Sequence, residues 1–577
     1  MNQDIQFILY FLTINFLCFS LGYLVNIKQQ PNPFYLFNGN IRNVRSFLVK
    51  IYRRSTSDFL RINVDCASLI LLFGFIDIEV KLASHIIAVV CLWGLIYMTY
   101  LFTIAFFFRR FPMIQADVNF MAVGLTLLKN KKYILFSAVL ILLVVFYFLF
   151  FYLASNLLLL KVSNTISFLI FLGVAFFGFR NLSIFPFLSH HTRAFISPTF
   201  HFIKNVINSN KYANLLNFEV PEVLLKNIYS NFKIHHKPDI VIISVESLGS
   251  IAFKDEEIFI EIKDVLIEYQ EKFSVSGIHI ASSYSTPPQF GGGSWLSVGS
   301  LLYGYKMEND VQYNALFKNQ SNFKGYESMI HYFKNQGYNA SMITTLGGFD
   351  ESDVDWEKVK NVYPMDSFVK WEDLEYSGKT VSFLAAASYC PPDQYSLWKG
   401  MEIINSKTTQ PKISVFPTLN SHSNWDSPLA LESDFKRLNI IDNYETTTNT
   451  KKPRKVNYIS AITYQLELVF DYVHKNPDKV YIIFGDHQPP FITPDSFGFE
   501  TPLYVLSTNQ ELINVFKQEG FDKDLINLNN NIRHEGFYSL FMKSFLRVYS
   551  DSGVELPTFP DGIIFGCKSP IDSKVTQ

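Results

Sequence analysis

The chain has 577 residues, a formal net charge of −1 and a hydrophobic content of 49%. A charge so close to zero argues against the strongly basic surface of a nucleic-acid-binding protein, so no nucleic-acid partner is expected. The length exceeds one ordinary domain, and long apolar runs dominate before residue 180 but not after it, so the two parts need separate interpretations.

Five apolar segments in the first part are candidates for membrane-spanning helices: residues 6–27, 64–78, 85–108, 133–154 and 157–179. Three of them approach or exceed the roughly 20 residues that a span requires, whereas the second is short and ends at Asp77 and Glu79. The first segment lacks the basic start of a signal peptide, so we expect it to be a retained anchor. Residues 1–180 are predicted to form a transmembrane domain of about five helices, followed by a membrane-interface linker over 181–236.

The loops after the first and third predicted spans are rich in lysine and arginine. The positive-inside rule would place both loops, and with five spans also the C-terminal part, in the cytoplasm. Alternatively, the basic stretches "RNVRSFLVKIYRR" and "FMAVGLTLLKNKK" are amphipathic helices that lie on anionic headgroups, which is possible on either face of the membrane. Charge alone therefore leaves the direction of the spans open.

Residues 237–550 have the pattern of an α/β domain, and residues 551–577 form a C-terminal tail. The runs "DIVIISV", "ASMITT", "KISVFPTLNS" and "KVYIIFG" are typical of buried strands, and they alternate with amphipathic helical segments. This alternation predicts a mainly parallel sheet that helices cover on both faces. In such sheets, ligands bind beyond the carboxyl ends of the strands.

Potential chemistry follows three of these strands. Glu246 follows the first run, His422 the third, and Asp486 and His487 the fourth. Any one of them alone is more often an ordinary loop or capping residue, because strand ends are commonly polar. Together, two carboxylates and an imidazole at one sheet edge make a nitrogen and oxygen ligand set that suits zinc or manganese.

The segment "TPPQFGGGSWLSVGSLLYGY" offers a reacting group. Three glycines precede Ser294, and "WLSVGSLLYG" is predicted to be a short apolar helix that ends at Gly304. Glycines allow close approach of the backbone, and a helix start presents free N–H groups to a phosphate or sulfate. Ser294 is therefore either a helix cap, which is the commoner role, or a metal-activated nucleophile.

The segments "VIISVESLGS", "GGGSWLSVGSLLYG", "NSHSNWDSP" and "IIFGDHQPP" occur in the order found in the alkaline phosphatase and sulfatase superfamily. The chain resembles its membrane-anchored branch, the lipoteichoic acid synthases and the phosphoglycerol or phosphoethanolamine transferases. The resemblance covers nearly the whole chain, because members of this branch have several N-terminal spans and then an extracytoplasmic catalytic domain.

The resemblance implies roles for particular residues. Glu246, Asp486 and His487 would be metal ligands, and the oxygen of the nucleophile would complete the coordination. His422 would contact the phosphoryl oxygens or the leaving group. Two tryptophans beside these residues, Trp295 and Trp425, are candidate substrate-binding residues.

The resemblance leaves the nucleophile open between two residues. Lipid-dependent members usually use threonine, and Thr286 lies eight residues before Ser294. We favour Ser294, because it directly follows the glycines and opens the predicted helix. The sulfatase motif C/S-x-P-x-R is incomplete, since "STPPQ" lacks the arginine. The acidic segment "TTLGGFDESDVDW" falls where the synthases keep an aromatic and a basic group for glycerol phosphate. Its carboxylates could meet a cationic headgroup such as ethanolamine, but charge runs of this kind are usually solvated loops.

The resemblance implies a two-step transferase of the bacterial cytoplasmic (inner) membrane, with its catalytic domain outside the cytoplasm. A phosphoglycerol or phosphoethanolamine headgroup would pass from a phospholipid donor through a covalent phospho-enzyme to a hydroxyl of a cell-envelope glycan or glycolipid. The alternatives are a hydrolase of the same superfamily (a phosphatase, phosphodiesterase or sulfatase) and a lipid-binding membrane regulator without turnover. The complete ligand set disfavours the regulator.

Overall fold

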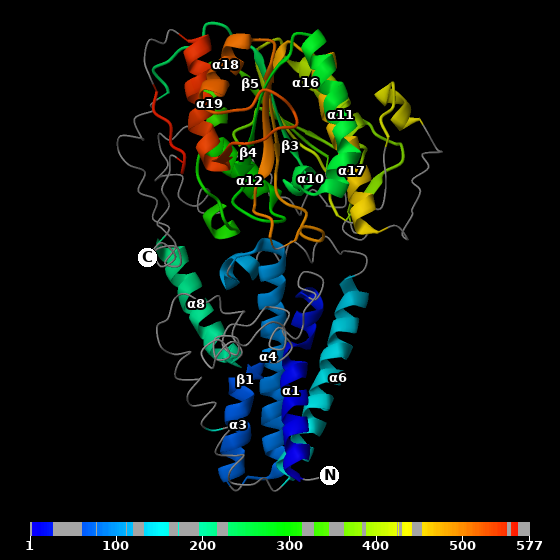
Figure 1. Cartoon of the computed structure of the whole chain (residues 1–577), viewed down its shortest axis with the longest axis vertical. Coiled ribbons are helices and arrows are strands. Elements are labelled where there is room, and N and C mark those ends of the chain that lie inside the picture. Colours follow the sequence, from blue (N-terminus) through cyan, green and yellow to red (C-terminus); the bar gives the residue numbers. More distant parts are fainter. Residues whose placement is uncertain are drawn as a thin grey trace. The chain divides into compact units, whose positions relative to one another are not determined.

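The computed structural model describes residues 3–26, 61–76, 78–110, 112–118, 132–160, 171, 195–215, 229–313, 328–345, 363–383, 388–423, 425, 430–440, 453–494, 496–550 and 556–562. The chain divides into two compact units, shown in Figure 1. The first contains residues 1–118, 131–215 and 568–577, and the second contains residues 119–130 and 216–567.

The first unit is a bundle of helices, most of which are apolar. Its described elements are α1 (Gln3–Asn26), α3 (Val64–Phe75), α4 (Val80–Phe108), α6 (Lys132–Leu158), α8 (Pro198–Leu215) and the parallel pair β1 (Ile62–Asn63) and β2 (Phe195–Ile196). Helix α4 packs against both α1 and α6. Among the described residues, three helical stretches are long and apolar enough to cross a membrane: Gln3–Gly22, Val80–Phe108 and Phe136–Leu158.

These three stretches confirm the predicted spans at 6–27, 85–108 and 133–154. The weak candidate at 64–78 is the helix α3 of 12 residues. At about 1.5 Å per residue, α3 is shorter than the roughly 30 Å thickness of the hydrocarbon core. The candidate at 157–179 lies mostly outside the described residues, as do the two basic stretches that were interpreted as amphipathic helices.

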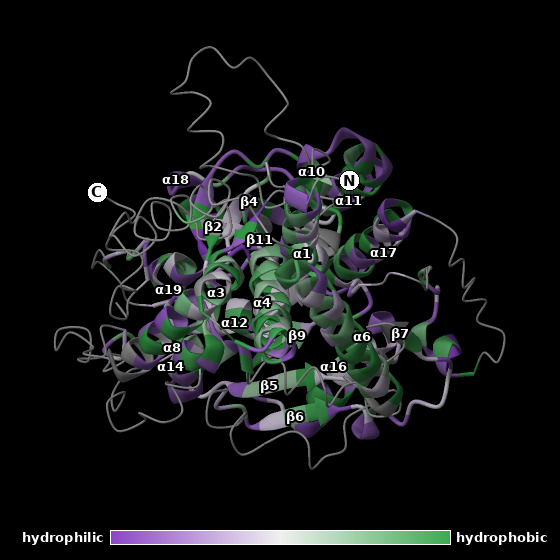
Figure 2. Cartoon of the chain, turned by 90° about the horizontal axis from the view of Figure 1, so that it is seen from below, coloured by the Kyte–Doolittle hydropathy of each residue, from purple (hydrophilic) through white to green (hydrophobic). Residues whose placement is uncertain are grey.

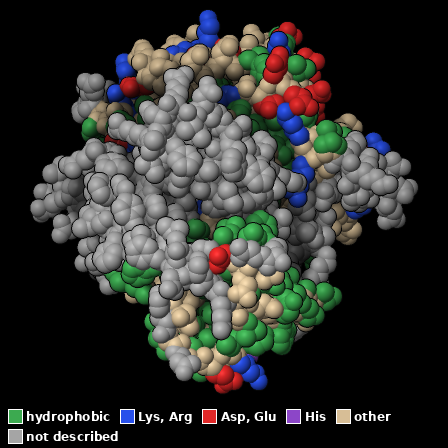
Figure 3. Space-filling model, turned by 60° about the horizontal axis from the view of Figure 1, so that its bottom comes forward, with side chains coloured by type: hydrophobic (Ala, Val, Ile, Leu, Met, Phe, Trp, Pro, Cys, Tyr) green, Lys and Arg blue, Asp and Glu red, His purple; other side chains and the backbone are tan. Residues whose placement is uncertain are grey.

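The long helices of this unit consist mainly of hydrophobic residues (Figure 2), and apolar side chains cover much of its described surface (Figure 3). On α6, the exposed side chains include Ile134, Phe136, Ile141 and Phe148, each more than 60% exposed. So many exposed apolar side chains along one helix would be unfavourable in water, whereas hydrocarbon chains solvate them. The first unit is therefore a transmembrane unit.

The second unit is built on a sheet that has eight strands among the described residues, in the order β12-β4-β11-β10-β3-β9-β5-β6. The strands are β3 (Asp239–Val245), β4 (His279–Thr286), β5 (Asn339–Thr344), β6 (Ser367–Lys370), β9 (Lys412–Pro417), β10 (Lys479–Gly485), β11 (Thr501–Ser507) and β12 (Asn531–Arg533). Within this sheet only β11 runs against its neighbours. The carboxyl ends of β4, β10, β3 and β9 therefore meet at one edge.

Helices cover both faces of this sheet (Figure 1). One layer contains α11 (Glu256–Val275), α16 (Asp393–Lys407) and α17 (Arg454–Lys475), and the other contains α12 (Ser294–Tyr303), α18 (Gln510–Gln518) and α19 (His534–Tyr549). The shorter elements are α10 (Ile251–Lys254), α14 (Met329–Asn335), the 3-10 helices η4 (Glu372–Leu374) and η5 (Phe435–Asn439), and the hairpin of β7 (Val381–Phe383) and β8 (Ser388–Cys390).

The two helical layers explain the continuous apolar runs of the central strands. Val241 and Ile243 of β3 belong to one core cluster with Leu266 of α11 and Phe470 of α17. The alternate residues of β3 point to the opposite face and are also fully buried. A strand that is buried on both sides needs apolar residues at successive positions. The predicted fold, a multi-span membrane domain followed by a mainly parallel α/β domain, is confirmed.

Candidate active site

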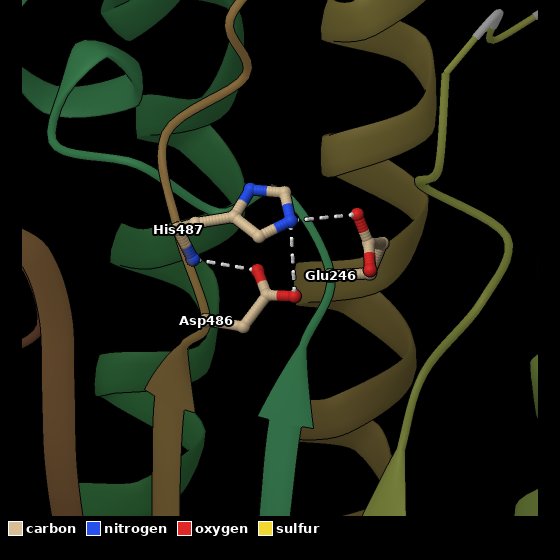
Figure 4. A group of neighbouring side chains, drawn as sticks. All are labelled: Glu246, Asp486 and His487. Atoms are coloured by element: carbon tan, nitrogen blue, oxygen red, sulfur yellow. Dashed lines mark hydrogen bonds and ion pairs between the residues drawn. The ribbon is translucent and has the colours of Figure 1, made fainter. Parts of the chain in front are cut away.

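Glu246, Asp486 and His487 form the one group of potential metal ligands found among the described residues, and their ligand atoms all lie within 4.8 Å of one another (Figure 4). The register of the sheet brings them together. Gly485 of β10 pairs with Val245 of β3 in parallel, so the residues that follow these two leave the sheet side by side. All three side chains are buried.

His487 faces both carboxylates. Its Nε2 lies 3.4 Å from Glu246 Oε1 and 3.5 Å from Asp486 Oδ2. Its Nδ1 lies 2.9 Å from the carbonyl oxygen of Gln488. A carbonyl can only accept, so Nδ1 donates, and Nε2 of the neutral ring keeps its lone pair for a metal ion.

Two buried polar atoms of this group lack a hydrogen-bond partner among the described residues: Asp486 Oδ2 and His487 Nε2. Buried polar atoms are normally satisfied, so these two atoms are candidates for binding a ligand. One carboxylate oxygen and one imidazole nitrogen, both directed at the same place as Glu246, fit zinc or manganese. The residues therefore fit the metal that the sequence predicted.

Backbone contacts hold Asp486 in place. Its Oδ1 accepts hydrogen bonds of 2.7 Å from the N–H groups of both Ser247 and His487. Ser247 adopts a positive φ of 57°, and its hydroxyl donates a 2.8 Å hydrogen bond to Glu246 Oε1. The chain thus turns sharply after β3, and this turn directs an N–H group at the aspartate.

The electrostatics of the two carboxyls differ. Burial, together with the neighbouring Glu246, raises the pKa of Asp486 well above its usual range. Burial also tends to raise the pKa of Glu246, but His422, His487 and the Ser247 hydroxyl hold it below its ordinary value. A cation at this position would offset the repulsion between the two carboxylates.

Ser294 joins this group directly. It begins α12, and its hydroxyl donates a 3.0 Å hydrogen bond to Glu246 Oε2. The preceding Gly293 has φ 71°, in the left-handed region that glycine tolerates best. One helical turn later, the Ser297 hydroxyl donates a 2.6 Å hydrogen bond to the backbone oxygen of Asp486, so the start of α12 is tied to the ligand loop.

Thr286, the alternative nucleophile, ends β4 and is bonded elsewhere. Its hydroxyl donates a 3.1 Å hydrogen bond to Asn531 Oδ1, on the neighbouring strand β12. The structure therefore brings Ser294, and not Thr286, into hydrogen-bond contact with a predicted metal ligand.

His422 lies in the loop after β9 and is half-buried. Its Nδ1 is 2.9 Å from the Ser423 carbonyl oxygen, so Nδ1 donates. It directly follows Ser421, whose hydroxyl donates a 2.6 Å hydrogen bond to the Glu246 carbonyl oxygen, so the loop that carries His422 contacts the backbone of Glu246.

The two predicted substrate-binding tryptophans have different environments. Trp425 is buried; its indole N–H donates to the Ser421 carbonyl oxygen at 2.6 Å and its ring packs against Tyr458. Trp295 is half-buried and donates to Asp310 Oδ1 at 2.9 Å. Their substrate contacts stay predictions. Most of the acidic segment 344–356 lies outside the described residues.

The sequence did not predict two hydroxyl groups that form hydrogen bonds with the backbone of Glu246. The Glu246 N–H donates a 3.0 Å hydrogen bond to Thr418 Oγ1, and the Ser421 hydroxyl donates a 2.6 Å hydrogen bond to the Glu246 carbonyl oxygen. Both residues lie in the quoted run "KISVFPTLNS", but hydroxyls after a strand are so common as turn residues that the local pattern does not distinguish this role.

The match to a known sequence family lies in the second unit. Residues 238–511 match the sequence model of the Sulfatase family. No curated protein sequence matches the chain.

Several solved structures are similar. The lipooligosaccharide phosphoethanolamine transferase A (EptA) from Neisseria meningitidis is 12% identical, with 94% of this chain and 97% of that chain covered and a TM-score of 0.47. The phosphoglycerol transferase GacH of Streptococcus pyogenes, in complex with sn-glycerol-1-phosphate, is 13% identical, with coverages of 64% and 90% and a TM-score of 0.35. The lipoteichoic acid synthase LtaP from Listeria monocytogenes is 12% identical, with coverages of 61% and 80% and a TM-score of 0.35.

Proposed function

We propose that this protein is a metal-dependent transferase of phospholipid headgroups. The proposal starts from the match of residues 238–511 to the Sulfatase family, in a chain that also has helices long and apolar enough to cross a membrane. It would move phosphoglycerol or phosphoethanolamine through a covalent phospho-enzyme to a hydroxyl of a cell-envelope glycan or glycolipid. The observation that carries the proposal is the hydrogen bond from the Ser294 hydroxyl to Glu246, inside a buried group with unsatisfied ligand atoms.

Glu246, Asp486 and His487 would hold the metal, together with the oxygen of Ser294. A bound zinc or manganese ion would supply a Lewis acid that neutralises phosphoryl charge and makes a serine hydroxyl easier to deprotonate. The sheet edge holds these residues before substrate arrives, so little reorganisation is needed during the reaction.

In the first step, Ser294 Oγ attacks the phosphorus of the donor lipid and gives up its proton along the hydrogen bond to Glu246. The bond between phosphorus and the diacylglycerol oxygen breaks, and His422 protonates that oxygen. In the second step, His422 takes the proton of the acceptor hydroxyl, which attacks the phosphorus, and Ser294 leaves and recovers its proton. Imidazole suits both transfers because it exchanges protons near neutral pH.

The transmembrane unit supports a lipid donor, because a protein that resides in the bilayer meets phospholipids by lateral diffusion. We place the protein in the bacterial cytoplasmic (inner) membrane with its catalytic domain outside the cytoplasm, against the simple count of basic residues in its loops. Protease treatment of intact spheroplasts tests this orientation. Digestion beyond residue 215 is expected, and full protection would contradict it.

The proposed activity has a direct test. The purified full-length protein is incubated with manganese or zinc and with either phosphatidylglycerol or phosphatidylethanolamine. It is then digested, and the masses of its peptides are measured by mass spectrometry. We expect an adduct on the peptide that contains Ser294, and its mass identifies the headgroup. If neither an adduct nor diacylglycerol forms with either metal, the lipid-donor proposal fails.

The match to the Sulfatase family itself favours a second candidate, a hydrolase in which water replaces the acceptor. The two reactions differ in their products. A transferase forms headgroup–acceptor product when an acceptor glycan is present, whereas a hydrolase releases the free headgroup phosphate at the same rate with or without it.

A further inference from the structure

A second buried carboxylate, Asp393, lies at the start of α16 and has no role in the steps above. Its side chain is fully buried. It accepts hydrogen bonds from the N–H of Leu419 at 2.9 and 3.1 Å, the N–H of Asn420 at 2.7 Å and the side-chain amide of Gln465 at 2.5 Å. In return, the Asp393 N–H donates a 2.6 Å hydrogen bond to Asn420 Oδ1.

These contacts join three elements. Asp393 belongs to α16, Gln465 to α17, and Leu419 and Asn420 to the loop after β9. A carboxylate has two oxygens and about four acceptor positions, so it can receive several converging N–H groups, whereas an asparagine in its place would offer one acceptor oxygen. Burial raises the pKa of Asp393 to about 6, so the ionised form, which only accepts, is available at neutral pH.

The loop after β9, to which Asp393 is hydrogen-bonded, also forms hydrogen bonds with the backbone of the proposed metal ligand Glu246. Thr418, immediately before Leu419, accepts the Glu246 N–H, and Ser421, immediately after Asn420, donates to the Glu246 carbonyl oxygen. His422 is the next residue. A shift of Leu419 and Asn420 would therefore displace both the backbone of a metal ligand and the proposed proton donor.

We propose that Asp393 is a positioning residue, whose hydrogen bonds to the loop after β9 set the position of Glu246 for the metal and of His422 for proton transfer. This inference rests on the proposed function and deepens it. Residues that orient metal ligands through hydrogen bonds typically increase metal affinity 10- to 100-fold.

The test compares Asp393→Asn with a matched control, Asp366→Asn. Asp366 also accepts a backbone hydrogen bond, from Ala340 of β5 at 2.8 Å, and pairs with Lys334 at 2.8 Å, but it contacts neither Glu246 nor the loop after β9. Zn²⁺ or Mn²⁺ alone is titrated into the metal-free, full-length protein in detergent. We expect Asp393→Asn to weaken binding by about 10- to 100-fold and Asp366→Asn to leave it unchanged.

Turnover gives a second readout. Asp393→Asn is expected to lower kcat while the KM for the lipid donor stays close to that of the wild type, because Asp393 is fully buried and offers no surface to a substrate. A folded Asp393→Asn variant with the metal affinity and kcat of the wild type would overturn the inference, as would a loss of thermal stability alone.

If Asp393→Asn does not fold, Gln465→Met replaces it, because this change removes one donor and keeps the carboxylate. A clear loss of metal affinity in Gln465→Met supports the inference, and wild-type affinity overturns it. A wild-type protein that binds neither ion would reject the proposed function itself, whereas a wild type that binds metal equally with both variants rejects this inference alone.

Discussion

The Ser294 hydroxyl lies 3.0 Å from Glu246 Oε2 and donates a hydrogen bond to it. This contact joins the first residue of α12 to the first residue after β3, 48 positions apart in the chain. The proposed chemistry depends on it, because a nucleophile has to lie beside the group that activates it.

Ser294→Ala should therefore abolish headgroup transfer, with a loss on the order of 1,000-fold or more. Thr286→Val is the matched control, since it removes a hydroxyl that bonds to Asn531 and not to the ligand group. Release of diacylglycerol from labelled donor lipid measures both variants. Loss of activity in Thr286→Val, with activity kept in Ser294→Ala, would reverse the assignment.

Metal binding should stabilise the folded protein. A ligand that binds only the native state at 100 times its Kd adds about 2.7 kcal/mol to the free energy of unfolding. We expect zinc or manganese to raise the Tm of the metal-free wild type, and a chelator to lower it again.

The same titration on His487→Gln and Glu246→Gln should show little or no rise in Tm, because each change removes a ligand from the group of three. His474→Gln serves as the control, since His474 is an imidazole whose Nδ1 bonds to Ser276. An equal rise in Tm for wild type and both ligand variants would show that the ion binds elsewhere.

The glycine before the nucleophile should be specifically required for activity. Gly293 has φ 71°, and a Cβ there would lie 2.8 Å from Gln289 Oε1. Gly293→Ala should cost about 1–2 kcal/mol of stability through backbone strain and should also reduce kcat, because relief of the strain moves Ser294.

Gly277→Ala separates these two effects. Gly277 has a similar φ of 69°, but nothing lies within 4 Å of the place where its Cβ would be. We expect a comparable loss of stability with full activity. If both alanine variants kept wild-type kcat, the position of Ser294 would not depend on the conformation of Gly293.

Stability should depend on pH through Glu535, in the first turn of α19. Its side chain is 1% exposed, its two oxygens accept no hydrogen bond from the described residues, and burial raises its pKa from 4.5 to about 7. The folded state therefore binds this proton more tightly than the unfolded state. The contribution of Glu535 to the free energy of unfolding is therefore fully present below about pH 4.5 and decreases as the pH rises to about 7. Above that pH the free energy of unfolding stays lower, by at most about 3 kcal/mol.

Glu535→Gln removes this titration. Relative to the wild type, the variant should therefore be more stable at pH 8 than at pH 5, as measured by denaturant unfolding at the two values. Glu271→Gln, on the exposed side of α11, is the control and should show no such difference. A gap between wild type and Glu535→Gln that does not change with pH would contradict the assigned shift.

Much of the fold was predictable because its signals are local. The runs that became β3, β5, β9 and β10 are apolar at successive positions, as strands buried on both faces must be. The strands β4 and β11 were missed. The run "HIASSYST" of β4 contains buried serines and so lacks a continuous apolar signal. Strand β11 follows β10 with no helix among the described residues between them and runs against its neighbours, so it departs from the alternating pattern of strand and helix.

The sequence by itself determined which residue types follow the strands, and hence Glu246, His422, Asp486 and His487 as candidates, because a buried apolar run that ends in polar groups is readable from neighbouring positions. Only the tertiary structure decided that Ser294, and not Thr286, contacts the Glu246 carboxylate, and that Asp393 is hydrogen-bonded to the loop after β9. Strand order and helix packing set those distances, and they join residues 26 to 72 positions apart, beyond the reach of any local pattern.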